Sequence, residues 1–108
     1  MRFKLIVVTV RTDLTERIVE AGQSVGATGA TILPARGAST KKAKTFFGLS
    51  LEVQRDVILF LVSKQMARAI LERIHETHDF SKPGTGIVFV LDAEQLTGLK
   101  KQKPHLQK

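Results

Sequence analysis

The order of strand-type and helical segments most constrains how this 108-residue chain folds. Stretches dense in Val, Ile and Leu predict strands, and these run over Arg2–Val10, Gly29–Ala35, Leu51–Val62 and Ile87–Leu91. Between the first and second strands, and again between the third and fourth, apolar residues recur three and four positions apart and predict helices. The order β-α-β-β-α-β predicts an α+β fold, a ferredoxin-like sandwich. In that architecture two helices cover one face of a four-stranded antiparallel sheet.

Polar residues and glycine mark the ends of the two helices. We expect Thr12 or Asp13 to cap the first helix, because Asp13 and Glu16 have the spacing of a capping box. Gly26 is positioned to end that helix, since glycine adopts left-handed backbone angles without strain. Ser63 is the expected cap of the second helix.

The first, third and fourth strands are apolar at consecutive positions rather than at alternate ones. A half-exposed antiparallel strand alternates apolar and polar residues, so these strands predict two apolar sheet faces. The helices cover only one of these faces. We therefore expect the chain to form an oligomer in which the open sheet faces pack together.

The positive charge of the chain is concentrated in one loop and one tail. Seventeen Lys and Arg against ten Asp and Glu give a formal charge of +7. Eight of these basic residues are Arg36, Lys41, Lys42, Lys44, Lys100, Lys101, Lys103 and Lys108. A basic nucleic-acid-binding module is one interpretation, although such modules more often carry their charge along a helix or strand surface. The absence of Trp and Tyr also argues against a base-stacking surface.

Two short glycine-containing segments are candidates for anion binding. The first is Lys82-Pro83-Gly84-Thr85-Gly86. Its two glycines allow consecutive backbone N–H groups to point into one concave surface, beside the ammonium group of the lysine. Arg36-Gly37-Ala38-Ser39-Thr40 can hold an anion in the same way. An ordinary turn and an ordinary loop are the alternatives. Neither segment matches a Walker or dinucleotide-binding glycine motif.

The inventory of catalytic and metal-binding residues is small. The chain has no cysteine, so thiolate chemistry and Cys-based metal sites are excluded. His75 and His78, three apart on the second helix, are weak candidates for a metal site, and the favourable position of His near a helix C-terminus is the alternative. No Ser lies in a nucleophile-elbow context. We expect a protein that is not an enzyme and that holds no metal.

With these elements in place, the chain resembles the PII nitrogen-regulatory signalling family from about Phe3 to Leu99. The residues that carry the resemblance are Gly26-Ala27-Thr28-Gly29-Ala30-Thr31-Ile32 leading to Arg36-Gly37, and Lys82-Pro83-Gly84-Thr85-Gly86 leading into Ile87–Asp92. The resemblance implies one domain over residues 1–99, with the family's T-loop at about 37–50. A basic tail follows at 100–108.

The resemblance also implies a homotrimer with a nucleotide site in each cleft between subunits. The residues it implies for nucleotide or anion binding are Thr31, Arg36, Gly37, Val62, Lys82, Gly84, Thr85, Gly86 and Lys100. The T-loop residues it implies for contact with a partner protein are Ser39, Thr40, Lys41, Lys42 and Lys44. The partner is expected to be an enzyme or a membrane transporter.

The chain departs from the family pattern at three positions that bear on the ligand. Ile87 stands where the family has a basic residue, and Gly98 and Lys100 stand where it has two arginines. We therefore expect no tightly bound cofactor and an effector such as ADP, AMP or ATP, or another small anion. Because the chain has no tyrosine, the tyrosine uridylylation of many members is excluded. No signal peptide or membrane span is recognisable, so the expected location is the cytoplasm.

Overall fold

The computed structural model describes residues 2–36, 45–46, 49–50, 54–81 and 86–98. Its elements, in chain order, are β1 (Phe3–Arg11), the 3₁₀ turn η1 (Thr12–Leu14), α1 (Thr15–Ser24), β2 (Thr31–Arg36), β3 (Thr45–Phe46), β4 (Leu49–Ser50), β5 (Gln54–Ser63), α2 (Lys64–Thr77) and β6 (Gly86–Ala93).

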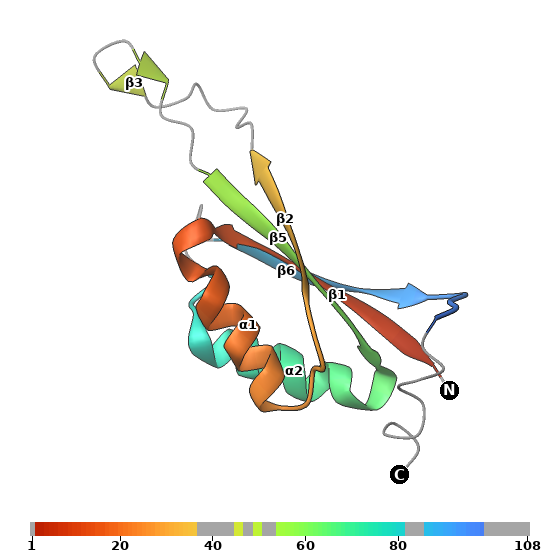
Figure 1. Ribbon diagram of the computed structural model, residues 1–108. Coiled ribbons are helices and arrows are strands. Elements are labelled where there is room, and N and C mark those ends of the chain that lie inside the picture. Colours follow the sequence, from red (N-terminus) through yellow and green to blue (C-terminus); the bar gives the residue numbers. More distant parts are fainter. Residues whose placement is uncertain (1, 37–44, 47–48, 51–53, 82–85, 99–108) are drawn as a thin grey trace.

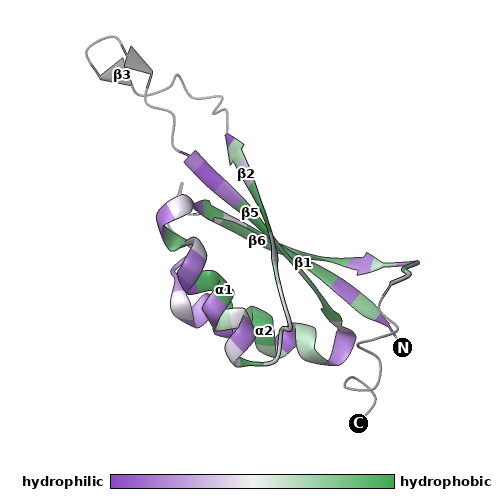
Figure 2. Ribbon diagram, viewed as in Figure 1, coloured by the Kyte–Doolittle hydropathy of each residue, from purple (hydrophilic) through white to green (hydrophobic). Residues whose placement is uncertain are grey.

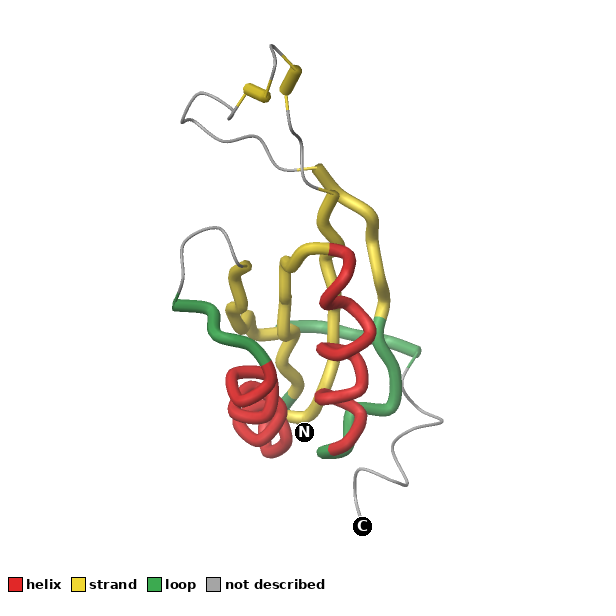
Figure 3. The backbone as a smooth tube through the Cα atoms, turned by 90° about the vertical axis from the view of Figure 1, so that its left-hand side faces the viewer, coloured by secondary structure: helices red, strands yellow, loops and turns green. Residues whose placement is uncertain are grey.

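One four-stranded sheet organises the fold. Its strands lie in the spatial order β2-β5-β1-β6, and every neighbouring pair is antiparallel. Both helices lie on the same side of this sheet (Figure 1), and the turned view of Figure 3 shows them beside each other on that side. The predicted ferredoxin-like α+β fold is confirmed.

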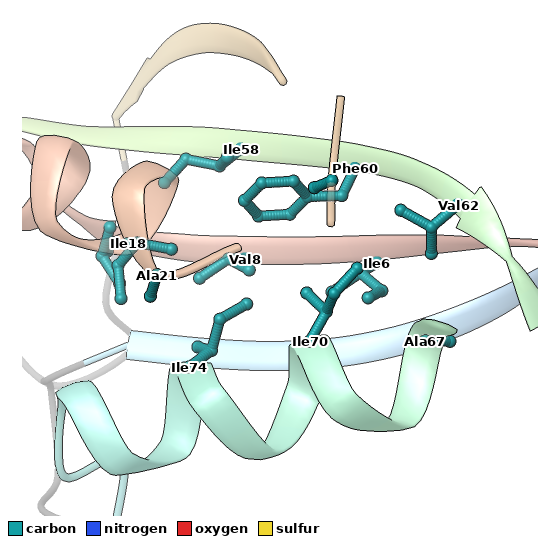
Figure 4. Close-up of a cluster of buried hydrophobic side chains, with 12 residues drawn as sticks. Ile6, Val8, Ile18, Ala21, Ile58, Phe60, Val62, Ala67, Ile70 and Ile74 are labelled. Carbon is teal, nitrogen blue, oxygen red and sulfur yellow. The ribbon is translucent and has the colours of Figure 1, made fainter. Parts of the chain in front are cut away.

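The hydrophobic core lies between the sheet and the two helices. Alternate residues of the central strands, Ile6 and Val8 on β1 and Ile58 and Phe60 on β5, are fully buried there. Figure 4 shows them facing the helices. The helical side chains that meet them are Ile18 and Ala21 of α1, and Ala67, Ile70 and Ile74 of α2. Spacings of three and four residues place each helical set on one face, which is why these segments form helices.

The opposite side of the sheet is an open apolar face. Side chains alternate along a strand, so the residues between the core positions point away from the helices. Leu5 of β1 lies between Leu91 of β6 and Leu61 of β5. Ile87 and Phe89 extend this surface, and the four residues on β5 and β6 are 39–59% exposed. Figure 2 shows hydrophobic residues along these strands. The two-faced strands expected from the sequence are present.

The start of the first helix differs from the capping-box prediction. A 3₁₀ turn precedes α1, and no side-chain capping bond is formed at either start. The carboxylate of Asp13 instead accepts hydrogen bonds from Arg11, at 3.1 Å from Nε and 2.6 Å from the terminal nitrogen. A guanidinium two residues away is a stronger donor than a backbone N–H, so the carboxylate turns toward it. Gly26 has a φ of +117°, as expected for the residue that follows the helix end.

The segment between β2 and β5 contains two strands that the sequence did not indicate. Thr45–Phe46 pairs with Leu49–Ser50 in a separate two-stranded ladder. Two residues per strand are too few to produce a recognisable apolar period, so this ladder left no signal in the pattern.

Candidate functional site

Two candidate anion-binding segments attach to the same end of the sheet, which we call the loop end. Asp56 of β5, Val10 of β1 and Gly86 of β6 are direct neighbours across three strands. Neighbouring strands lie about 4.8 Å apart, so the backbones at Asp56 and Gly86 are about 10 Å apart. The segment 37–53 connects β2 to β5 at this end, and the turn 82–85 leads into β6 there. The register thus brings together two loops that are distant in the sequence.

The backbone at Gly86 accepts no other residue without rearrangement. Its φ is +146°, and a Cβ at this position would lie 2.6 Å from the carbonyl oxygen of Thr9. It would also lie 3.2 Å from Cε1 of Phe80. Glycine is therefore needed here for the close approach of β6 to β1, in addition to any contact that its N–H makes with a ligand.

The other end of the glycine turn is held by side chains of the α2–β6 connection. The backbone N–H and hydroxyl of Ser81 both donate to Oδ1 of Asp79, at 2.9 and 2.5 Å. The ring of Phe80 meets the rings of His75 and His78 edge-on, with centroids 5.7 and 4.9 Å apart. Both sides of the turn are thus anchored to the folded body.

These ring contacts bear on the metal candidates. His75 and His78 both pack against Phe80. Within residues 2–36, 45–46, 49–50, 54–81 and 86–98, the structure contains no group of three or more His, Cys, Asp or Glu side chains that can hold a metal ion. In this part of the fold the observed ring contact of both histidines is with Phe80, and metal binding by them stays a prediction.

A cleft of about 510 Å³ lies at the loop end beside Arg36. Its walls are formed by residues 34–36 of β2, residues 54–56 of β5, and Thr12. Asp56, on one wall, is only 8% exposed, and its Oδ2 accepts a hydrogen bond of 2.6 Å from Thr15 at the start of α1. Asp56 is not among the site residues expected from the sequence. The available signal was an acidic residue directly before the apolar run of residues 57–62.

Two further site candidates lie away from the loop end. Val62 is six residues from Asp56 along β5, a distance of about 20 Å along an extended strand. Its side chain is 4% exposed and belongs to the core, so only its backbone can meet a ligand. Thr31 is exposed at the start of the edge strand β2. One copy of the chain therefore does not bring Val62 and Arg36 to the same ligand.

The remaining site candidates lie outside the described residues. They are Gly37, Ser39, Thr40, Lys41, Lys42, Lys44, Lys82, Gly84, Thr85 and Lys100. Their contacts with a ligand or a partner stay predictions.

Two exposed ion pairs lower the pKa of carboxyl groups near the ends of β1. The hydrogen bond and charge of Lys4 hold the pKa of Asp92 below its ordinary value. The hydrogen bond from Arg11 does the same for the pKa of Asp13. Such exposed pairs affect stability modestly and are weakened by salt.

Comparison with known proteins decides the family. The family described as "Nitrogen regulatory protein P-II" matches residues 3–103. The chain belongs to the P-II family. No curated protein sequence matches it significantly.

Two solved structures place this P-II chain among known folds. A protein described as a PII-like signaling protein from Thermus thermophilus is 27% identical, with a TM-score of 0.63 over 86% of this chain and 88% of that chain. A crystal structure of PII from Arabidopsis thaliana bound to citrate is 23% identical, with a TM-score of 0.66 over 85% of this chain and 78% of that chain. The second likeness concerns the fold alone.

The resemblance inferred from the sequence is therefore confirmed, and the chain has the fold of a P-II signalling protein. Proteins of this family are regulatory. No helix in the described part of the chain is long and apolar enough to cross a membrane.

Proposed function

We propose that this P-II chain is a homotrimeric regulator without enzymatic activity. It binds an adenine nucleotide or another small anion in each cleft between subunits. Its T-loop, residues 37–50, then changes affinity for a partner protein. The ligand-contacting residues are those implied by the family resemblance, centred on Arg36 and the glycine turn that ends at Gly86.

The position of the candidate residues within one chain carries this proposal. Arg36 and Gly86 lie at the loop end, whereas Val62 lies about 20 Å away along β5. A single ligand contacts both groups only if the loop end of one copy meets the far end of another copy. Such a head-to-tail contact closes into a ring when its rotation is suitable. This supports a site shared between subunits.

The open face supports the assembly. Leu61, Ile87, Phe89 and Leu91 form part of a continuous apolar surface across the sheet. Soluble proteins rarely leave such a surface in contact with water. Packing these faces together around one axis removes them from water, and the number three comes from the family resemblance.

Regulation through the T-loop requires that the ligand distinguishes two states of that segment. A ligand shifts the equilibrium between two conformations only by its difference in affinity for them. The segment joins β2 and β5 directly at the cleft beside Arg36. A ligand bound there contacts the base of the loop, and this contact makes the ligand's affinity differ between the two conformations of the segment. The lysines at 41, 42 and 44 favour an acidic partner surface, and the expected setting is the cytoplasm.

The test is isothermal titration calorimetry of the purified protein with ATP, ADP and AMP. We expect saturable binding to the wild-type protein and a loss of at least tenfold in affinity for Lys82→Ala, since a phosphate loses a charge-assisted donor. Arg68→Ala is the matched control, because Arg68 is exposed on α2 and pairs with Glu72. Equal affinity in Lys82→Ala and wild type would refute the placement of the site.

A second result would refute the proposal more broadly. If none of the three nucleotides releases or absorbs heat, but a DNA duplex binds with an affinity that falls steeply with salt, the basic segments serve nucleic-acid binding instead.

A further inference from the structure

The cleft beside Arg36 has a buried carboxylate on its wall, that of Asp56. Asp56 is only 8% exposed, and its Oδ2 accepts the hydroxyl hydrogen of Thr15 at 2.6 Å. Thr15 is itself buried at the start of α1. Because a buried carboxylate is costly to separate from its donor, this bond holds Asp56 in place. Its negative charge is therefore a fixed feature of the cleft.

Asp56 lies on the same sheet face as Arg36. Residues directly opposite each other on antiparallel strands share a face, and so do residues two apart on one strand. Asp56 is opposite Pro34 of β2, and Arg36 is opposite Gln54 two residues further along both strands. Ile58, two residues from Asp56 in the other direction, belongs to the core under the helices. Asp56 and Arg36 therefore both line the cleft from the helix side of the sheet.

A negative charge at this place opposes the binding of an anion. The proposed ligand carries phosphate groups, and its proposed site is centred on Arg36 and on the turn that ends at Gly86. The backbone at Gly86 is about 10 Å from the backbone at Asp56. Like charges at such a distance repel each other, and salt screens this repulsion less where one charge is buried. Asp56 therefore weakens the binding of an anion at the loop end, and the effect grows with the charge of the anion.

This repulsion distinguishes nucleotides that have the same base. Without magnesium, ATP carries about two more negative charges than AMP, because each further phosphate group adds about one. At a separation of about 10 Å, an effective dielectric constant of about 20 and about 0.1 M salt, each unit of charge lowers the affinity by a factor of about three. Asp56 therefore disfavours ATP relative to AMP by about tenfold.

We infer that Asp56 is a specificity-determining residue, which makes the loop end select a nucleoside monophosphate over the corresponding triphosphate. This inference rests on the proposed function, because it concerns the ligand of the same site. It deepens that function by naming the charge of the ligand and the residue that discriminates it. Asp56 acts through its charge and needs no contact with the ligand.

The experiment is calorimetry of the full chain with AMP and with ATP, in EDTA so that no divalent cation offsets the phosphate charge. We expect the wild-type protein to bind AMP more tightly than ATP. Asp56→Asn keeps a carbonyl oxygen for the hydroxyl of Thr15 but removes the charge. We expect this variant to raise the ratio of ATP affinity to AMP affinity about tenfold at about 0.1 M salt. At about 1 M salt the difference from wild type should disappear, because the Debye length falls to about 3 Å.

Control variants separate the charge of Asp56 from its part in the fold. Thr15→Val removes the same hydrogen bond but keeps the carboxylate, so we expect no rise in the ratio of affinities. Glu72→Gln removes one negative charge at an exposed position of α2 that pairs with Arg68, and we expect it to bind both nucleotides like wild type. Asp56→Ser removes the charge with a smaller side chain, and it replaces Asp56→Asn if circular dichroism shows that the latter does not fold.

The outcomes distinguish this inference from the proposed function. An unchanged ratio in a folded Asp56→Asn protein, an equal rise in Thr15→Val, or a wild-type preference for ATP would overturn the inference and leave the proposed function standing. If neither nucleotide binds to the wild-type protein or to any variant, the proposed function and the inference both fail. Binding of ATP to Asp56→Asn but not to wild type would support both.

Discussion

Substitution of Gly86 by alanine is the sharpest structural test of the loop end. At this position the backbone φ is +146°, a region that residues with a Cβ rarely occupy. The added methyl group would lie 2.6 Å from the carbonyl oxygen of Thr9 and 3.1 Å from Cγ1 of Val10. Thr9 belongs to the central strand β1, which pairs with strands on both sides. Its carbonyl cannot retreat without disturbing that pairing.

The magnitude follows from two contributions. Holding a non-glycine residue in a sparsely populated backbone region costs about 1–3 kcal/mol. The contact with Thr9 adds to this cost, because contacts under 3.0 Å are essentially never made by real Cβ atoms. We therefore expect Gly86→Ala to lower the free energy of unfolding by about 2–4 kcal/mol. For a chain near 100 residues, that loss lowers the Tm by about 10–20 °C.

The assay is urea denaturation followed by circular dichroism, with all variants at the same protein concentration because association contributes to stability. Gly29→Ala is the matched control, since no atom lies within 4 Å of the Cβ it would add. We expect its free energy of unfolding to stay within about 0.5 kcal/mol of wild type or to rise slightly, because alanine restricts the unfolded chain. A midpoint for Gly86→Ala equal to that of Gly29→Ala would refute the reasoning about the approach of β6 to β1.

Two further predictions concern the open face and an exposed ion pair. Phe89→Lys places a charge on the open face, so we expect analytical ultracentrifugation to find monomers, whereas Gln65→Lys on the exposed side of α2 should assemble like wild type. An equally assembled Phe89→Lys would exclude this face as the subunit interface. Because Lys4 lowers the pKa of Asp92 in the folded chain, their pair stabilises the fold above the unfolded pKa of about 3.9. We expect Asp92→Asn to lower the Tm at neutral pH, and this difference to disappear as the pH falls through the folded pKa of Asp92; a constant difference at every pH would contradict the assignment.

The fold was predictable because local patterns and the order of elements agree. Ile70 and Ile74 of α2 are four residues apart, and both reach the core as the helical period requires. Strand ends were less accurate, since β2 begins at Thr31 rather than Gly29 and ends at Arg36 rather than Ala35. The capping box failed for a different reason. Spacing alone does not reveal that the guanidinium of Arg11 competes for the carboxylate of Asp13.

Of the candidate site, the structure describes the constrained backbone at Gly86, whereas the ligand contacts of the site stay predictions. A glycine ahead of a strand is a visible signal, and Gly86 lies where the register brings β6 close to β1. Asp56 was not found, because its importance depends on tertiary contacts with Thr15 and with the cleft. Neither contact is visible in a sequence in which Thr15 and Asp56 are 41 positions apart.

Strands that are apolar at consecutive positions also hide which residues face the helices. In a strand that alternates apolar and polar residues, the polar positions show which side chains face water. A shift of the strand by one residue would then expose the apolar side chains that belong in the core. In β6 the side chains of both faces are apolar, so the sequence alone does not show whether Val88 or Phe89 faces the helices. The register and the helices separate them, because Val88 packs against the core whereas Phe89 is 45% exposed on the open face. Because β6 lacks polar residues at alternate positions, the sequence does not show which of its side chains face the helices. For the same reason the second face of the sheet is apolar, and an apolar face of this kind needs a partner to cover it.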